Sequence, residues 1–389
     1  IRVNGFEEIV TILRDIDFDW AVRLHRVILK ASGIWPEIYE NPWKKWLLYL
    51  FNMINILALL SSVIIPAIYG LYHSRYDLLG IIDNLQFTVP MASTLAKYLD
   101  VWAGKKALIG MIQEISDDWA KPKNPHEREM MISQAKLCRT VFTATTLLMG
   151  IPTALFLSLP LLGFKLRYNL GPNERPLVLP SRFIFDVNVS PNYELTYFAQ
   201  SYAVSFAALA YTAVDNFIVL LIFHIRGQLK NLRSRILMMS RSETFQSDLI
   251  ITVNDHIRLI RTIGIMDNIF TRAFGGILLY FSIIFCLYAL MILYVIQYFC
   301  KKIINSCFIL FVAYSDGRSY RLIIYNAVCA CEWENLKPHE ARKLILIMVY
   351  TSRPVYLTAA KIIPMNITTF CKMLQMSASY ISFLFAKLQ

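Results

Sequence analysis

The stretch WLLYLFNMINILALLSSVIIPAIYGLY, residues 46–72, contains no charged side chain. A helix needs about 20 consecutive apolar residues to cross the hydrocarbon core of a bilayer. This stretch therefore predicts a membrane-spanning helix, even though Pro66 lies within it. Three further stretches have the same character: residues 141–164, residues 195–224 with Asp215 inside them, and residues 273–300.

Three weaker apolar runs complete the pattern. Residues 78–96 contain Asp83 and Pro90, residues 303–315 are short, and residues 362–386 carry Lys372. Polar groups in a span cost less when they face water or the bundle interior than when they face lipid. The fold class predicted is therefore all-α, a polytopic membrane protein with seven transmembrane helices. A membrane-embedded carboxylate such as Asp83 or Asp215 serves either a proton relay or a packed polar network, and the network is favoured two to one.

The overall composition agrees with a bilayer as solvent. Hydrophobic residues make up 56% of the chain and charged residues 17%, against about 45–50% and about 25% in soluble proteins. The formal charge of +12 first calls for a topological explanation. A nucleic-acid partner is not expected, because no basic face with base-reading elements stands out.

The distribution of Lys and Arg predicts the orientation. With a cytoplasmic N-terminus and seven spans, the inner segments hold 23 basic residues and the outer segments hold 8. This bias favours a cytoplasmic N-terminus and an extracellular C-terminus. Apolar residues at helical spacing in residues 225–240 predict an amphipathic helix that either coats the membrane surface or extends a span into the cytosol.

Enzyme signatures are missing from the chain. There is no H-E-x-x-H, no P-loop and no G-x-S-x-G, and the cysteines form no C-x-x-C pair. We therefore expect no catalytic residues, no cofactor and no metal site. Cys300 and Cys307 flank one short loop, and the sequence leaves open whether they form a disulfide.

The last sixty residues carry an ordered set of short motifs. They are WENL at 333–336, KPHEARK at 337–343, SRP at 352–354, LTA at 357–359, IPM at 363–365, TF at 369–370 and SxSY at 377–380. Together they closely resemble the C-terminal signature of the insect odorant receptor family. The rest of the chain agrees with that family in length and span layout.

The resemblance implies a function and an assembly. It implies an odorant-binding subunit of a ligand-gated non-selective cation channel, with four subunits around one pore and a shared odorant co-receptor as partner. It also implies membrane lipid as surroundings, a small volatile odorant as ligand, and the plasma membrane of olfactory sensory neurons as location. The short segment 225–262 between spans four and five is typical of the tuning subunit, because the co-receptor has a longer insertion there.

The same resemblance divides the chain into four regions. Residues 1–45 are expected to form a cytoplasmic N-terminal region, and residues 46–315 the first six spans with the ligand-binding bundle. Residues 316–360 correspond to a cytoplasmic anchor region containing a short helix at 338–353. Residues 361–389 correspond to the pore-lining last helix, from about residue 362, and the extracellular C-terminus.

The last helix shows a polar stripe by its own periodicity. At 100° per residue, one face about 120° wide carries Lys372, Gln375, Met376, Ser379, Ser382, Phe383 and Ala386. A polar stripe on a span suits a water-filled path, and the alternative is packing against another helix. The resemblance places the narrow gate near Phe383 and Ala386.

The resemblance also implies a ligand cavity in the outer half of the bundle. The matching residues are Phe87, Met91, Met149, Gly150, Thr153, Tyr202, Phe206 and Tyr288. For any one of them, ordinary bundle packing is about as good an explanation. The competing classes are a gustatory-receptor-like channel, a G-protein-coupled receptor and a transporter.

One modification site is expected outside the membrane. Asn188-Val189-Ser190 is an acceptor triplet for N-glycosylation in the loop before the fourth span. Its use would agree with an N-inside topology, because that topology makes the loop extracellular.

Overall fold

The computed structural model describes residues 2–35, 41–73, 78–121, 123–162, 175–179, 181–239, 244–294, 320–331, 336–351, 357–365, 368–373, 375–376 and 379. Its elements are α1 (Arg2–Ala31), α2 (Pro42–Leu59), the π-helical turn η1 (Leu60–Ile64), α3 (Ile65–His73), α4 (Leu78–Ala103), α5 (Lys105–Ala120), α6 (Pro125–Ser158), α7 (Asn192–Met239), α8 (Phe245–Tyr294), α10 (Tyr320–Cys329), α11 (Pro338–Thr351), β1 (Thr358–Ala359) and β2 (Ile363–Pro364). The predicted all-α class is confirmed.

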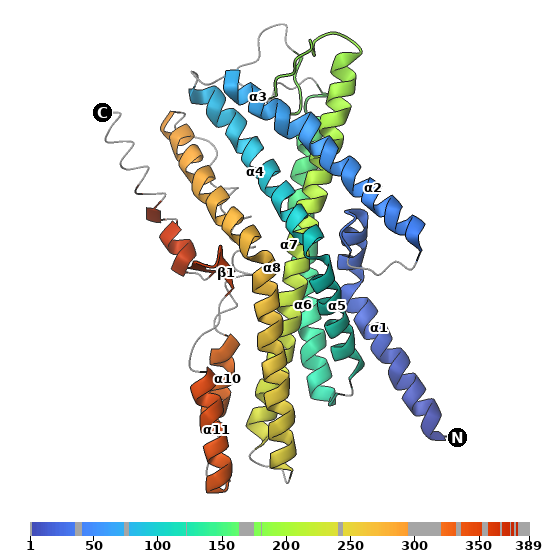
Figure 1. Cartoon of the computed structure of the whole chain (residues 1–389), viewed down its shortest axis with the longest axis vertical. Coiled ribbons are helices and arrows are strands. Elements are labelled where there is room, and N and C mark those ends of the chain that lie inside the picture. Colours follow the sequence, from blue (N-terminus) through green and yellow to red (C-terminus); the bar gives the residue numbers. More distant parts are fainter. Residues whose placement is uncertain are drawn as a thin grey trace.

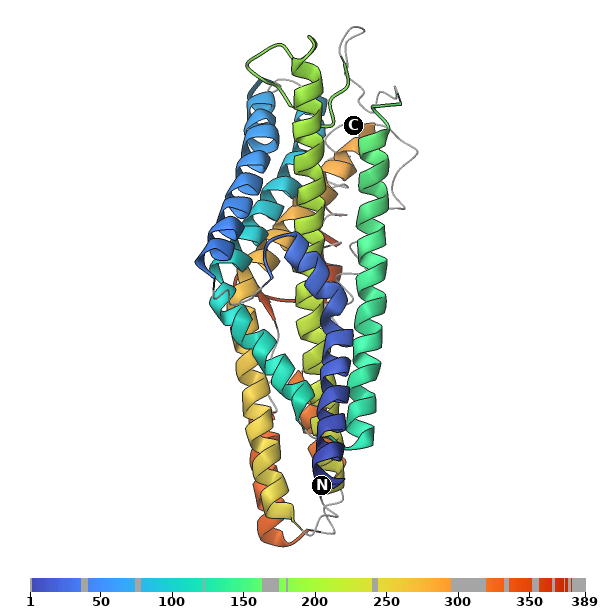
Figure 2. The same ribbon diagram turned by 90° about the vertical axis from the view of Figure 1, so that its right-hand side faces the viewer.

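The helices form an elongated bundle around α7. Figures 1 and 2 show α7 running through the molecule, with α2, α3 and α4 around one end and α1, α5 and α11 toward the other. The helix α6 packs along α7, and α4 packs along both α7 and α8. The N-terminus lies at the same end as α11.

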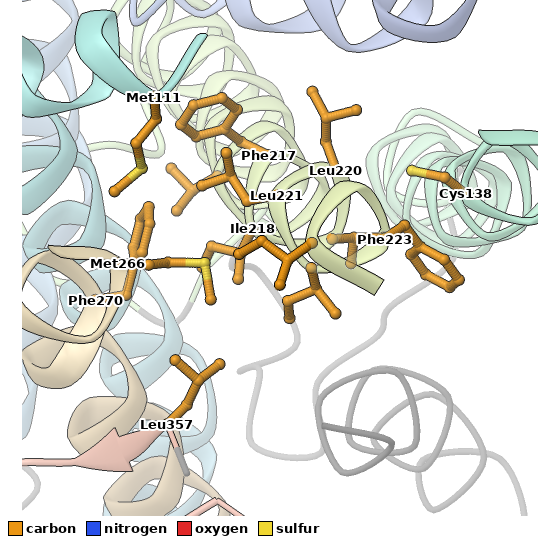
Figure 3. Packing of buried hydrophobic residues seen from close by; sticks show 14 of the residues in the cluster. Met111, Cys138, Phe217, Ile218, Leu220, Leu221, Phe223, Met266, Phe270 and Leu357 are labelled. Atoms are coloured by element: carbon orange, nitrogen blue, oxygen red, sulfur yellow. The ribbon is translucent and has the colours of Figure 1, made fainter. Parts of the chain in front are cut away.

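The central position of α7 follows from its composition. The run from residue 213 to residue 223 is buried throughout, and Asp215 and Asn216 within it cost less inside the bundle than against lipid. Figure 3 shows Phe217 and Leu221 of α7 within one packed cluster that also contains Met111 of α5 and Met266 of α8. This cluster joins α5 and α8 to the central helix α7.

Where they are described, the predicted runs 46–72, 78–96, 195–224 and 273–300 lie in helices, and the run 141–164 is helical as far as Ser158. Three stretches are long and apolar enough to cross a membrane, namely Pro42–His73, Pro125–Ser158 and Asn192–Met239, and a shorter apolar stretch runs from Phe274 to Ile283. The predicted run 78–96 lies within α4. The run 303–315 and the pair Cys300 and Cys307 lie outside the described residues.

Pro66 is accommodated by a partner from another helix. Proline lacks an amide hydrogen, so it leaves the carbonyl four residues earlier, that of Ser62, without its usual donor. The side chain of Gln200, which is fully buried on α7, donates from Nε2 to that carbonyl at 3.4 Å. The π-helical turn η1 directly precedes the proline. The span therefore stays continuous through the proline and is fixed to α7 at that level.

Residues 225–239 extend the predicted fourth span as one continuous helix, while the side of the membrane on which they lie stays a prediction. These residues continue α7 as far as Met239, and α8 begins at Phe245. Ion pairs join the extensions: Arg235 of α7 contacts Glu127 of α6 at 2.5 Å, and Arg258 of α8 contacts Asp118 of α5 at 2.8 Å. The short helix predicted at 338–353 corresponds to α11, Pro338–Thr351, and its anchor role stays a prediction.

The predicted start of the last helix at residue 362 is wrong. Ile363 and Pro364 form β2, which pairs antiparallel with β1, and helix is described only from residue 368. Proline biases the residue before it toward extended backbone, which disfavours helix at Ile363. The expected regional boundary at 360/361 falls inside the turn of this hairpin.

Candidate ligand site and pore helix

A hollow opens between α6 and α7 at the level of Asp215. Its volume is about 410 Å³ including its open mouth, and its lining residues are Thr145, Leu148, Met149, Tyr211, Thr212, Asp215 and Asn216. Most of the accessible lining is apolar, with a few fixed polar groups. This combination is the usual chemistry of a small-molecule site.

A buried ion pair borders the hollow. Lys97 of α4 contacts Asp215 of α7, with Nζ 3.0 Å from Oδ1 and 3.3 Å from Oδ2. The two side chains are 2% and 4% exposed. The ammonium group also lies 3.7 Å from the ring centre of Tyr211, a cation–π geometry. Asp215 therefore belongs to a packed network, as favoured from the sequence.

Asn216 holds the wall of the hollow next to that pair. Its Oδ1 accepts a hydrogen bond from Thr145 Oγ1 of α6 at 2.9 Å, and its Nδ2 donates to the carbonyl of Thr212 at 3.0 Å. Asn216 is 1% exposed. The bond to Thr145 holds α6 and α7 in register where the hollow lies, and the bond to Thr212 within α7 fixes the orientation of the amide.

Several residues of the expected ligand set lie on or near this hollow. Met149 lines it, and Thr153 lies one turn further along α6, where its hydroxyl donates to the Met149 carbonyl at 2.7 Å. Gly150 has open space where a Cβ would stand. Phe87 of α4 stacks on Phe156 of α6 with ring centres 5.5 Å apart, about two turns along α6 from Met149. Met91 is half-buried and packs against the core.

Two other members of that set face α2. The hydroxyl of Tyr202 donates to Asn55 Oδ1 at 2.7 Å. Phe206 is buried and packs edge-on against Phe51 of α2 and Tyr98 of α4. The side chain of Tyr288 lies outside the described residues. The structure therefore separates Tyr202 and Phe206 from the α6 residues around the hollow.

The described part of the last helix exposes its predicted stripe. Lys372, Gln375, Met376 and Ser379 are all exposed, and the hydroxyl of Ser379 donates to the Gln375 carbonyl at 3.0 Å. Ser382, Phe383 and Ala386 lie outside the described residues. In the single chain, this face is accessible to water or to another subunit.

Asn188 lies in the loop that leads into α7, and its side chain is exposed. Its Oδ1 accepts a hydrogen bond from the backbone amide of Arg175 at 3.2 Å. The amide nitrogen to which a glycan would be attached is not used in that bond. Glycosylation at Asn188 stays a prediction.

A model of the family described as 7tm odorant receptor matches residues 77–315. The chain belongs to the 7tm odorant receptor family. That match covers α4 to α8 and includes the whole hollow and its ion pair.

Solved structures share the fold of this odorant receptor. The olfactory receptor OR5 from the insect Machilis hrabei in complex with eugenol has a TM-score of 0.79 and 16% identity, over 95% of this chain and 98% of that chain. A second structure of the same receptor has a TM-score of 0.77 and 16% identity, over 94% of this chain and 99% of that chain. Among curated proteins, no significant match was found.

Sequence reasoning missed most of the lining of the hollow, namely Thr145, Leu148, Tyr211, Thr212 and Asn216. It also missed Lys97, the partner of Asp215. Lys97 lies one position beyond the predicted run 78–96, so it was treated as the end of a span. A charge of opposite sign near a neighbouring span was the available signal, because intramembrane charges usually pair with one another. Pairing it with Asp215 requires knowing that α4 and α7 are neighbours.

The first helix, α1, carries a histidine with a displaced pKa. His25 of α1 is fully buried, packs edge-on against Phe142 at 4.7 Å, and lies 3.6 Å from Cys138 Sγ. Burial, aided by the charge of Arg139, lowers the pKa of His25 from 6.5 to about 3. The folded receptor therefore holds this imidazole neutral at pH values where the unfolded chain would protonate it.

The stability of the folded receptor is predicted to depend on pH through His25. Below pH 6.5 the unfolded state binds a proton at His25 and the folded state does not until about pH 3, so stability is lost as pH falls through that window. At about 1.4 kcal/mol per unit, the expected loss is about 2 kcal/mol between pH 6.5 and pH 5. Thermal unfolding of the purified receptor at several pH values measures it.

The control for this prediction compares two histidine substitutions. His25→Phe should flatten the pH dependence between pH 6.5 and 5. His339→Phe, at a side chain that is 65% exposed on α11, should leave it as in the parent. Equal pH dependence in the parent and in His25→Phe would contradict the assignment to His25.

Proposed function

We propose that this receptor is the odorant-binding, tuning subunit of a ligand-gated non-selective cation channel. It assembles with the shared odorant co-receptor into a tetramer in the plasma membrane of olfactory sensory neurons. A small volatile organic binds within the helix bundle and favours the open state of a central pore. The observation that carries the proposal is the largely apolar hollow between α6 and α7, which has a few fixed polar groups and lies in the family-matched region.

The chemistry of the hollow supports a small and mainly apolar ligand. Leu148 and Met149 provide dispersion contacts, while Thr145, Asn216 and the paired Asp215 limit where a polar group of the ligand can lie. A site of this kind binds by shape, because few polar groups remain to be satisfied. The complex of Machilis hrabei OR5 with eugenol provides a precedent for a small aromatic odorant on this fold.

The last helix supports the channel part of the proposal. A helix that exposes Lys372, Gln375 and Ser379 on one face is costly to place against lipid. Such a face is satisfied by water in a pore shared between subunits. The short connection between Met239 and Phe245 supports the tuning subunit over the co-receptor, since the co-receptor carries a longer insertion there.

The primary experiment is electrical recording. Cells expressing this chain with the co-receptor should give odorant-evoked cation currents across a broad panel, and cells expressing the co-receptor alone should lack the responses to those odorants. Equal responses with and without this chain would contradict the proposed function. Surface labelling of the chain establishes that it reached the membrane in the co-expressing cells, and surface labelling of the co-receptor does the same for the co-receptor in both.

A substitution at Met149 tests the location of the ligand. Met149→Trp places a larger side chain in the hollow, so we expect the concentration for half-maximal response to the largest active odorants to rise by about tenfold or more, equivalent to about 1.4 kcal/mol. The smallest active odorants should be affected least. Dose–response recordings over an odorant size series measure this.

A matched variant on the same helix controls for bulk. Ile151→Trp adds a ring at a side chain that is 56% exposed on another face of α6, and it should leave the dose–response curves as in the parent. If Met149→Trp and Ile151→Trp behave alike, the ligand lies elsewhere in the bundle.

A further inference from the structure

A small hairpin connects the anchor helix α11 to the last helix. The strands β1 and β2 pair antiparallel, and the amide of Met365 donates to the Leu357 carbonyl at 2.8 Å. The amide of Ile362 donates to the Ala359 carbonyl at 3.1 Å and closes the turn. Residues 357–365 form the linker hairpin. The chain must pass through it to reach the pore helix.

The turn of the linker hairpin has an unfavourable backbone. Ala360 and Lys361 have φ values of 52° and 61°. This left-handed region suits glycine and disfavours residues with a Cβ, and two consecutive residues occupy it here. Contacts from outside the hairpin must therefore hold this conformation in place.

Those contacts come from one face of α8. Asp267 Oδ1 accepts hydrogen bonds from the amide of Thr358 at 2.6 Å and from its hydroxyl at 2.9 Å, and Asp267 Oδ2 accepts from Lys361 Nζ at 2.6 Å. One turn further along α8, the Thr271 hydroxyl donates to the Thr358 carbonyl at 3.0 Å and accepts from the Lys361 amide at 2.9 Å. The Thr271 carbonyl accepts from the Ala360 amide at 2.9 Å. Asp267 and Thr271 together determine the position of the turn.

Apolar packing completes this contact. A Cβ built on Gly275 of α8 would lie 3.2 Å from the Cβ of Ala360, so the absence of a side chain at Gly275 lets the turn approach the helix closely. Leu357, at the start of the hairpin, is 4% exposed and belongs to the same buried cluster as Met266 and Phe270 of α8 (Figure 3).

The other end of the linker hairpin is fixed to the last helix. The hydroxyl of Thr369, in the first described turn of that helix, donates to the Pro364 carbonyl of β2 at 2.7 Å. Figure 1 shows the hairpin beside the middle of α8, with the last helix starting next to it. Direct contacts therefore run from α8 through the hairpin to the first turn of the pore helix.

We propose that Asp267 is a positioning residue for gating: it holds the linker hairpin on α8, so that movement of α8 is passed to the start of the last helix. This rests on the proposed channel function. The helix α8 carries Tyr288, one of the expected ligand residues, and packs along α4. A ligand that shifts α8 changes the pore only if α8 is connected to the last helix, and the linker hairpin provides that connection.

The experiment compares four variants expressed with the co-receptor. Asp267→Ala removes every hydrogen bond at that position. Asp267→Asn keeps an oxygen that accepts from Thr358 but loses the charge facing Lys361. Lys361→Met removes the ion pair from the half-exposed partner (side chain 50% exposed). The matched control is Arg272→Ala, which breaks the ion pair between the exposed Arg272 of α8 and the partly buried Asp100 of α4.

We expect the odorant-evoked current per receptor to fall while the amount of receptor at the cell surface stays as in the parent. The maximal odorant-evoked current per surface-labelled receptor should fall about five-fold or more in Asp267→Ala, the lower end of typical coupling between sites. Asp267→Asn should lie between it and the parent, and Lys361→Met should fall in the same direction by less. Lys361 Nζ also donates to Asn268 Oδ1 of α8 at 2.6 Å. The double variant Asp267→Ala with Lys361→Met should therefore lose less than the sum of the two single losses, because both changes remove the same Asp267–Lys361 ion pair. Arg272→Ala should behave as the parent.

If Asp267→Ala and Lys361→Met both give the same maximal odorant-evoked current per receptor as the parent, the inference is overturned. Should Asp267→Ala fail to reach the surface, Lys361→Met and Asp267→Asn decide alone, because each removes only part of the contact. Additive losses in the double variant would also overturn it. The parent is recorded first: if the parent gives no odorant-evoked current at all, the proposed channel function itself fails, and the inference with it.

Discussion

Replacing Asp215 by Asn is expected to remove most of the receptor from the cell surface. The substitution leaves the ammonium group of Lys97 in a site that is 2% exposed, without its carboxylate partner. Removing one member of a buried pair typically costs about 3–5 kcal/mol, which is a large share of the roughly 5–15 kcal/mol by which folded proteins are stable. Surface labelling and thermal unfolding of the solubilised receptor measure the effect.

Two comparisons make that expectation specific. Lys97→Met together with Asp215→Leu removes both charges, so no buried ion remains unpaired, and surface expression should largely return. Arg175→Ala breaks an ion pair whose side chains are 49% and 45% exposed, and it should cost about 1 kcal/mol or less. If Asp215→Asn unfolds at the same temperature as the parent, the pair is not a structural element of the bundle.

Replacing Phe383 by Ser is expected to raise the current that flows without odorant. By its position on the polar stripe and by the family resemblance, Phe383 is proposed to form the apolar constriction. A narrow apolar ring closes a pore because water leaves it, and a hydroxyl in its place keeps the constriction wet. A tenfold rise in ligand-independent current corresponds to about 1.4 kcal/mol in the closed–open balance. Baseline recording in the complex with the co-receptor measures it.

The companion variants test whether the same helix carries the ions. Lys372→Glu reverses a charge on the exposed stripe, so it should change cation permeability or conductance while leaving the odorant ranking as in the parent. Leu346→Ser, at a residue 71% exposed on α11, serves as a control for adding a hydroxyl away from the pore. If both stripe variants conduct like the parent, the last helix does not line the pore.

The spans were predictable because the bilayer imposes a strong local rule. Residues 46–72, 141–164 and 195–214 could be found from the absence of charge alone, since about 20 apolar residues are needed to cross the hydrocarbon core. The extension of α7 was visible at residues 225–240 as apolar residues at helical spacing. Local spacing left open whether these residues form a separate helix or continue the span, and the structure shows that they continue α7 and pack with α6 and α8.

The linker hairpin shows where a local rule was insufficient. Residues 362–364 begin an apolar run long enough for a span, and Pro364 was the one local sign of extended backbone. The conformation that the turn adopts, with left-handed backbone at Ala360 and Lys361, is not one that those residue types favour. Asp267 and Thr271 impose it, and they lie about ninety positions earlier in the chain.

By itself, the amino-acid sequence determined the all-α membrane class, the described spans, the anchor helix α11 and the family, because each depends on local composition or on short ordered motifs. Only the tertiary structure decided that Lys97 pairs with Asp215, that Met149 lines the hollow while Tyr202 and Phe206 face α2, and that α8 holds the linker hairpin. These are contacts between residues far apart in the chain. Their free energy appears only when the helices pack, since a charge or hydroxyl exposed to water gains little from a partner and a buried one requires it.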